Sequence, residues 1–231
     1  MDNDEQARRF LSQESWLKGT PDDFRRAVVS ACRFRWYESG EAVASAGEES
    51  ISIFAVVSGS LAATSVRGPK DAKLSYILPA GFWSGIVPLF TGRTRIVHHV
   101  ARGRTLIAHL EANSIRQMLK NEPGWWRHFG YLTTVMLEVV TGFASDLLTL
   151  DSRRRCIASL LHCTNLRWGP VPAGPIEVVF SQDELSSVAC ISRKTVGRIL
   201  KSLERERLVE VGYRSIKIND ARLFQRIADG E

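Results

Sequence analysis

The stretch SQDELSSVACISRKTVGRILKSLE, residues 181–204, contains two helix starts in one short run. Ser181 and Glu184 form a capping-box pattern, in which the serine hydroxyl and the glutamate carboxylate each bind a backbone N–H at the helix start. Ser192 is a second N-cap candidate, although Thr195 stands where a capping box has Glu or Gln. The pattern therefore predicts two short helices joined by a tight turn.

The second predicted helix has one apolar face and one basic face. The apolar face follows the spacing of a buried stripe, with Val196, Ile199, Leu200 and Leu203. The opposite face carries Lys194, Arg198, Lys201 and Arg205. Gly197 lies among these cations, and because glycine in a helix costs about 1 kcal/mol relative to alanine, it suggests a close approach to a partner. A helix-turn-helix places such a helix in the DNA major groove; the alternative is a solvated basic face on a structural hairpin.

The segments on either side of the two helices predict a small sheet. LVEVGYRSIKI, residues 208–218, consists of two alternating runs around Gly212 and predicts a hairpin directly after the second helix. IEVVF, residues 176–180, predicts a further strand, and the Gly- and Pro-rich residues 167–175 before it predict a loop. The combination favours a winged helix-turn-helix, in which Arg214 and Lys217 would contact phosphates and so position the protein.

The N-terminal part of the chain predicts a β-rich domain. Between residues 32 and 112, short β-branched and aromatic runs are separated by Gly, Pro and Ser, as in an antiparallel sandwich or barrel. RGPKD, residues 67–71, and GEESI, residues 47–51, supply turn chemistry. A short leading segment is expected to be helical.

A long helix is predicted over about residues 123–150. Its apolar residues recur near heptad spacing and form a seam of Phe129, Leu132, Met136, Val139, Phe143 and Leu150, of which the first five are the predicted dimer contact. The seam predicts either a dimer contact or packing against the chain's own barrel, and Asp146 at a seam position weakens the coiled-coil alternative. A new helix begins after this one, so the predicted domains are residues 1–150 and 151–231.

Charge and composition limit the classes of function. The chain has 31 basic and 25 acidic residues, and the part from Asp151 onward holds 14 and 10 of them, a net charge of +4 against +2 for the rest. Polyanions are therefore plausible partners. The four cysteines include no C-x-x-C pair, which favours a reduced, cytoplasmic protein. No signal peptide is expected, because the N-terminal MDNDEQARRF is charged and lacks an apolar stretch. No membrane span is expected, because the apolar residues 129–150 include Glu138 and Asp146.

The sequence contains no G-x-S-x-G, P-loop or H-E-x-x-H pattern. We therefore expect no enzyme, no catalytic residue, and no metal or other cofactor. An alternative to DNA binding is a ligand-binding or protein-interaction module whose winged helix contacts a protein.

SRKTVGRILKSLERERLVEV, with SQDELSSVAC before it, resembles the DNA-binding domain of the Crp/Fnr family of bacterial transcription regulators. The family's order, a β-roll sensor, a long dimerisation helix and a C-terminal winged helix, is similar to the order predicted above. The resemblance implies an α+β fold with a jelly-roll-like antiparallel β-roll, and a homodimer that binds a palindromic site in double-stranded DNA and contacts RNA polymerase. The resemblance implies that Arg193, Lys194, Gly197 and Arg198 read the bases. With the polar residues of the predicted helix and wing, the predicted DNA-binding residues are Ser192, Arg193, Lys194, Thr195, Gly197, Arg198, Lys201 and Arg214.

GFWSGIVPLFTGRTRIVHHVAR, residues 81–102, resembles the family's phosphate-binding cassette but departs from it twice. The cyclic-nucleotide binders of the family use a Gly-Glu pair for the ribose and an Arg followed by Ser or Thr for the phosphate. Here Gly85 is followed by Ile86, and Arg95 by Ile96. Each lost hydrogen bond to a charged group costs about 1.5–3 kcal/mol. Cyclic AMP is therefore not expected to bind in the usual manner, and the effector stays unknown.

Other sensor chemistries of the family have few candidate residues. An iron–sulfur cluster needs about four thiolates, and Cys32 stands alone in the N-terminal domain. His98, His99 and His109 are either ordinary strand histidines or candidate axial ligands of haem. Cys190, next to the basic helix, is either a small buried thiol or a redox switch.

Overall fold

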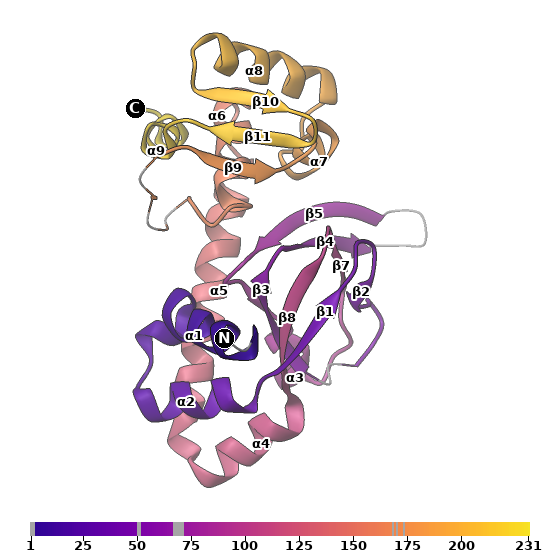
Figure 1. Cartoon of the computed structure of the whole chain (residues 1–231). Helices are drawn as coiled ribbons and strands as arrows, with labels where there is room; N and C mark the ends of the chain where they lie inside the picture. Colours follow the sequence, from indigo (N-terminus) through magenta and orange to yellow (C-terminus); the bar gives the residue numbers. More distant parts are fainter. Residues whose placement is uncertain (1–2, 50–51, 67–71, 168, 170, 173) are drawn as a thin grey trace. The chain divides into compact units, whose positions relative to one another are not determined.

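The computed structural model describes the chain except for residues 1–2, 50–51, 67–71, 168, 170 and 173 (Figure 1). The predicted turn at residues 67–71, two residues of the turn at 47–51 and part of the loop at 167–175 lie outside the described residues. The chain forms two compact units, one of residues 1–73 and 77–138 and the other of residues 74–76 and 139–231.

The elements up to residue 125 are α1 (Asn3–Glu14), the 3₁₀ helix η1 (Trp16–Gly19), α2 (Asp22–Ala31), β1 (Arg33–Tyr37), β2 (Ala42–Ala44), β3 (Ser52–Ser58), β4 (Ser60–Val66), β5 (Ala72–Pro79), β6 (Trp83–Ser84), α3 (Ile86–Thr91), β7 (Val97–Ala101), β8 (Thr105–Glu111), α4 (Ala112–Asn121) and the 3₁₀ helix η2 (Pro123–Trp125). The later elements are α5 (Trp126–Leu147), α6 (Ser152–His162), β9 (Ile176–Val179), α7 (Gln182–Val188), α8 (Arg193–Arg205), β10 (Val209–Gly212), β11 (Ser215–Ile218) and α9 (Ala221–Asp229).

The strands β1 to β8 build a β-roll of two sheets with strand orders β1-β8-β3-β6 and β2-β7-β4-β5. β8 pairs antiparallel with β1 and β3, and β7 pairs antiparallel with β2 and β4. The sheets meet face to face, since the ring of Phe54 in β3 lies 5.1 Å from that of His99 in β7. The predicted antiparallel β-roll is confirmed.

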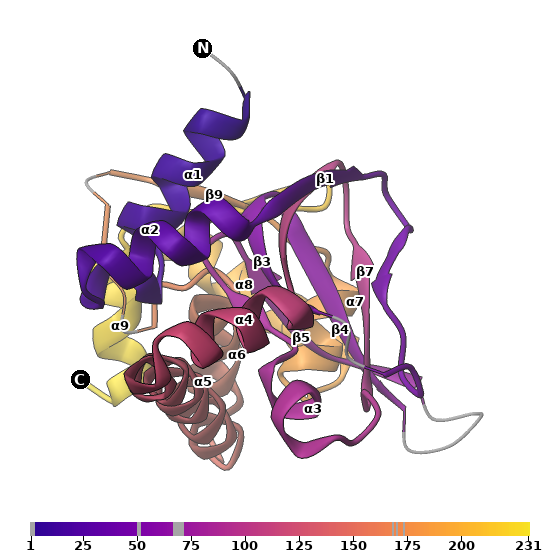
Figure 2. The ribbon, with the colours of Figure 1, turned by 90° about the horizontal axis from the view of Figure 1, so that it is seen from below.

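The hydrophobic core of the first unit lies between one sheet and the helices beside it. β3 alternates, so that Ile53, Ala55 and Val57 face this core. On the helical side, Phe24 of α2 and Phe129 of α5 pack edge to face, with ring centroids 5.3 Å apart. Figure 2 shows α1 and α2 beside the roll.

The long helix is shorter than predicted, because the chain forms a 3₁₀ turn at Pro123 before α5 begins at Trp126 and ends at Leu147. Its first turns are part of the core of the first unit, where Phe129 is 0% and Leu132 is 2% exposed. Among the described residues, no helix combines the length and the apolar character needed to cross a bilayer.

The second unit contains the predicted winged helix-turn-helix. α7 and α8 are followed by a hairpin, β10 and β11, and β9 pairs antiparallel with β11 to complete a three-stranded sheet. α9 was not predicted from the sequence. It starts at Asp220, whose side chain accepts a hydrogen bond from Leu223 N at 2.9 Å, and it buries Phe224 and Ala228. α9 therefore closes the core of this unit against α6.

Candidate nucleic-acid interface and effector site

Local hydrogen bonds fix the start of each helix in the helix-turn-helix. Ser181 N donates to the Glu184 carboxylate at 2.8 Å, and Glu184 N donates to Ser181 Oγ at 3.2 Å, which completes the predicted capping box. At α8, Thr195 N donates to Ser192 Oγ at 3.1 Å, and the two hydroxyl groups lie 2.8 Å apart. Both predicted N-caps are confirmed, and Thr195 supplies a hydroxyl where a capping box has a longer polar side chain.

The turn between α7 and α8 contains Cys190 in the left-handed region, with φ of +52°. Its side chain is exposed, so the interpretation of Cys190 as a small buried thiol was wrong. Cys156 and Cys163 are buried, and burial raises the pKa of the Cys156 thiol to about 12, which makes it unreactive.

The side chains predicted to bind DNA lie together on the second unit. Val196, Leu200 and Leu203 are buried, so α8 turns its other face to solvent. This outer face and the wing carry the residues named from the sequence: Ser192, Arg193, Lys194, Thr195, Gly197, Arg198, Lys201 and Arg214. The five cations in this set are all exposed. They give the surface a positive charge, which attracts DNA phosphates.

Gly197 does not have to be glycine for the protein to pack. A Cβ built on it would lie 3.4 Å from Gln182 Oε1, which is close to an ordinary contact. The residue therefore carries the helix-destabilising effect of glycine without a packing requirement inside this chain.

Gly85 and Arg95, the two cassette residues that this chain retains, lie side by side in the first unit. A Cβ on Gly85 would lie 2.9 Å from Arg95 Nη1, and the φ of Gly85 is +93°, so this position needs glycine. Arg95 is 6% exposed, and its Nη2 donates to the Ser52 carbonyl at 2.7 Å. Arg95 is thus held by the protein's own backbone.

The two isoleucines of the cassette lie in opposite environments. Ile86 is 1% exposed and belongs to the hydrophobic core of the first unit, whereas Ile96 is 77% exposed. Only Ile86 is therefore required by packing.

The three candidate histidines all make hydrogen bonds within the first unit. His98 Nδ1 accepts from Ala46 N at 3.1 Å, His99 Nε2 lies 3.2 Å from Ser84 Oγ, and His109 Nε2 lies 2.9 Å from the Tyr37 hydroxyl. Burial is the main cause that lowers the pKa of His99 and of His109, each to about 4, so both are neutral at pH 7. These contacts are those of ordinary strand histidines.

A cavity of about 700 Å³ in the first unit was not anticipated from the sequence. Arg33, Arg35 and Arg116 line it together with His109. Two of these arginines could have been predicted to lie together, because alternate residues of a strand share a face and Arg33 and Arg35 are alternate residues of β1.

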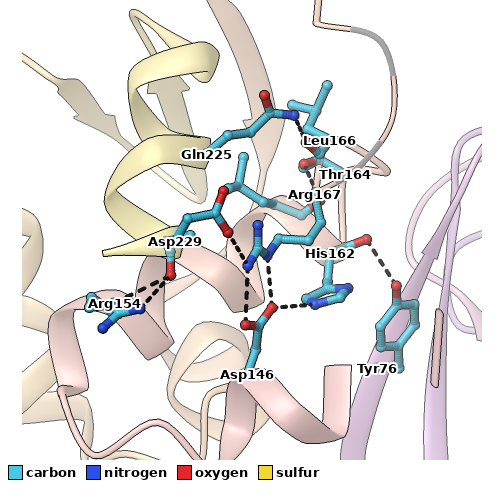
Figure 3. A network of polar contacts seen from close by, with 11 residues as sticks. Tyr76, Asp146, Arg154, His162, Thr164, Leu166, Arg167, Gln225 and Asp229 are labelled. Carbon is cyan, nitrogen blue, oxygen red and sulfur yellow. Dashed lines mark hydrogen bonds and ion pairs between the residues drawn. The ribbon is translucent and has the colours of Figure 1, made fainter. Parts of the chain in front are cut away.

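A polar network in the second unit links α5, α6 and α9 (Figure 3). Asp146 accepts hydrogen bonds from His162 Nε2 and from Arg167 Nε, both at 2.8 Å. Arg167, which is 8% exposed, also reaches Asp229 Oδ1 at 2.8 Å. The sequence predicted none of these contacts, but they explain why an apolar helix carries Asp146.

A β-roll, a long helix and a winged helix-turn-helix, in this order, define a class of DNA-binding regulators with a separate sensor domain. Residues 34–122 match the cyclic nucleotide-binding domain, and residues 148–227 match the Crp-like helix-turn-helix domain. The chain is 24% identical over 195 residues to the cAMP-activated global transcriptional regulator CRP of Pasteurella multocida (strain Pm70), covering 84% of this chain and 93% of the relative.

Solved structures share the fold. A CRP/FNR family transcriptional regulator from Thermus thermophilus has a TM-score of 0.65 and 20% identity, with 85% of this chain and 98% of the other covered. FixK2 from Bradyrhizobium japonicum has a TM-score of 0.71 and 15% identity, with 84% and 96% covered. The chain belongs to the Crp/Fnr family of transcription regulators.

Proposed function

We propose that this protein is a sequence-specific regulator that binds a palindromic DNA site as a homodimer. The observation that carries the proposal is the exposed, cationic start of α8, which is followed by a wing with Arg214 at its tip. Arg binds guanine O6 and N7 in a bidentate manner, and the start of a reading helix is the part that reaches base edges. Residues 151–231 would bind DNA, and residues 1–150 would sense the effector and form the dimer.

The dimer contact is proposed on a different face of α5 from the one predicted. Phe129 and Leu132 are buried in the first unit, and Met136, Val139 and Phe143 are only partly exposed. Another stripe of α5, continued just past its end, is exposed and small or apolar at heptad spacing: Gly130, Thr133, Thr134, Leu137, Val140, Thr141, Ala144 and Leu148. Tyr131, Glu138 and Ser145 of α5 are also exposed. Leu137 and Val140 are 62% and 59% exposed, so this stripe is suited to a second copy of the helix.

We further propose that DNA binding does not require cyclic AMP in the usual mode. The acid that would bind the ribose is replaced by Ile86, which is packed in the core, and Arg95 is bonded to the Ser52 carbonyl. The relative from P. multocida is named as cAMP-activated, and the cassette of this chain supports a different effector or none. RNA polymerase is proposed as a partner from the family alone.

Selection from a pool of randomised duplex DNA tests the proposal. The wild type is compared with Arg193→Ala/Arg198→Ala, with and without cyclic AMP. Arg222→Ala/Arg226→Ala is the matched control, because it removes two exposed arginines from α9 of the same unit. We expect the wild type and the control to enrich one palindrome without cyclic AMP. The reading-helix variant should lose at least about tenfold in affinity, since each good bidentate contact contributes about 1–3 kcal/mol.

Two results would contradict this function. Equal affinity of the wild type for every duplex, unchanged in the reading-helix variant, would exclude sequence reading. A flat dependence of binding on salt would favour the alternative in which the winged helix contacts a protein, because contacts with several phosphates give a steep negative slope.

A further inference from the structure

An ion pair joins the two helices of the helix-turn-helix at the DNA-binding surface. Asp183 Oδ1, in the first turn of α7, lies 3.2 Å from Arg193 Nε at the start of α8. Both side chains are about two-thirds exposed, at 66% and 68%. Asp183 is not used by the capping box, because Glu184 supplies that carboxylate. The Asp183 carboxylate is therefore available to hold Arg193.

The geometry of the pair suits an arginine that reads a base. The contact uses Nε, which leaves the two Nη groups of Arg193 for a bidentate contact with guanine. An arginine that is already restrained by an ion pair loses less conformational entropy when it binds DNA than a mobile arginine does, because part of its ordering takes place in the free protein. Among the described residues, Arg193 is the only cation of α8 with an acidic partner within 4 Å.

The same carboxylate also affects binding to DNA that lacks the correct base. Asp183 and Arg193 line a pocket of about 510 Å³ together with Tyr213 and Arg214 of the wing. A phosphate group that approached Arg193 here would also approach the negative charge of Asp183, and like charges repel. Without Asp183, Arg193 would bind any nearby phosphate, and such contacts carry no sequence information.

We propose that Asp183 is a specificity-determining residue of DNA recognition. It positions Arg193 for one base pair in each half-site, with guanine preferred, and it weakens binding to duplexes that lack this base pair. The inference rests on the proposed function, because it assumes that α8 reads DNA.

Full-length Asp183→Asn tests the inference, because it removes the charge and keeps the size of the side chain. We expect its affinity for non-cognate duplexes to rise about three- to tenfold, and its discrimination at a single base pair of each half-site to fall by a similar factor. Glu177→Gln is the matched control, since it makes the same charge change at an exposed position of β9. Asp183→Glu preserves the charge, and its discrimination should stay within about twofold of the wild type.

A double-mutant comparison isolates the pair. In Arg193→Ala, the added Asp183→Asn change should leave discrimination at that base pair unaltered, because no side chain remains to be positioned. The inference is overturned if the wild type selects a palindrome while Asp183→Asn retains every base preference, or if Glu177→Gln alters discrimination equally. A wild type that selects no sequence would instead refute the proposed function, and this inference with it.

Discussion

Ile86 and Ile96 differ in what a polar substitution would do to them. A carboxylate at position 86 would replace a side chain that is 1% exposed and belongs to the hydrophobic core of the first unit. A hydroxyl at position 96 would stay in water, because that residue is 77% exposed. Restoring the family's ribose-binding acid by one substitution would therefore damage the core.

We expect Ile86→Glu to lower the free energy of unfolding of the first unit by about 3 kcal/mol or more. Ile96→Ser, the matched change in the same cassette, should alter it by less than about 0.5 kcal/mol. Urea denaturation followed by tryptophan fluorescence measures both, because every tryptophan except Trp168 lies in the first unit. An Ile86→Glu protein as stable as the wild type would mean that residue 86 is not part of the core.

Among the elements, those determined by local hydrogen bonds were predicted best. The starts of α7 and α8 follow from Ser181 and Ser192, because a cap uses backbone groups only a few residues away. The face of α5 that is proposed as the dimer contact did not follow from the sequence, because heptad spacing cannot distinguish residues that pack in a chain's own core from residues that contact a second copy. The ion pair of Asp183 with Arg193 was also not predicted, because the two residues lie on different helices and the geometry of the turn between them cannot be derived from residue spacing.

The polar network that joins α5, α6 and α9 is expected to stabilise the second unit. Asp146→Ala should lower the local free energy of opening by about 2–4 kcal/mol, because it removes the carboxylate that accepts hydrogen bonds from His162 and Arg167. Hydrogen exchange of α6 and α9, measured by mass spectrometry, reports this change. Glu206→Ala, which removes an exposed partner of Arg153, is the control and should cost less than about 1 kcal/mol.

The pH dependence of the same variant follows from the pKa of Asp146. Burial would raise this pKa, but the hydrogen bonds from Arg167 and His162 outweigh burial and hold it below its ordinary value of 3.8. A carboxyl group with a lowered pKa in the folded state stabilises the protein above its unfolded pKa, and this contribution is lost as the pH falls through the folded pKa. The difference between the wild type and Asp146→Ala should therefore shrink toward pH 3, and a constant difference would contradict the role of the charge.

For the whole molecule, the proposed function depends on the exposed stripe of α5. One winged helix contacts one half-site, and two half-sites about one helical turn apart require two copies held in a fixed relation. Linking two DNA-binding units raises the effective concentration of the second unit and so the affinity for the full site. The stripe through Leu137 and Val140 would thus determine whether the protein distinguishes a palindrome from a single half-site.

Leu137→Lys/Val140→Lys is expected to separate the two copies, because it places cations at the centre of an apolar contact. Light scattering after size exclusion should give 25.8 kDa for the variant and twice this mass for the wild type. The affinity for a palindrome should fall at least about 100-fold, while binding to one half-site changes little. Val179→Lys is the control, because it makes the same kind of change at a residue of β9 that is 65% exposed. This variant should have the same mass in solution as the wild type. A dimeric Leu137→Lys/Val140→Lys protein would place the interface on another surface and contradict the proposed seam.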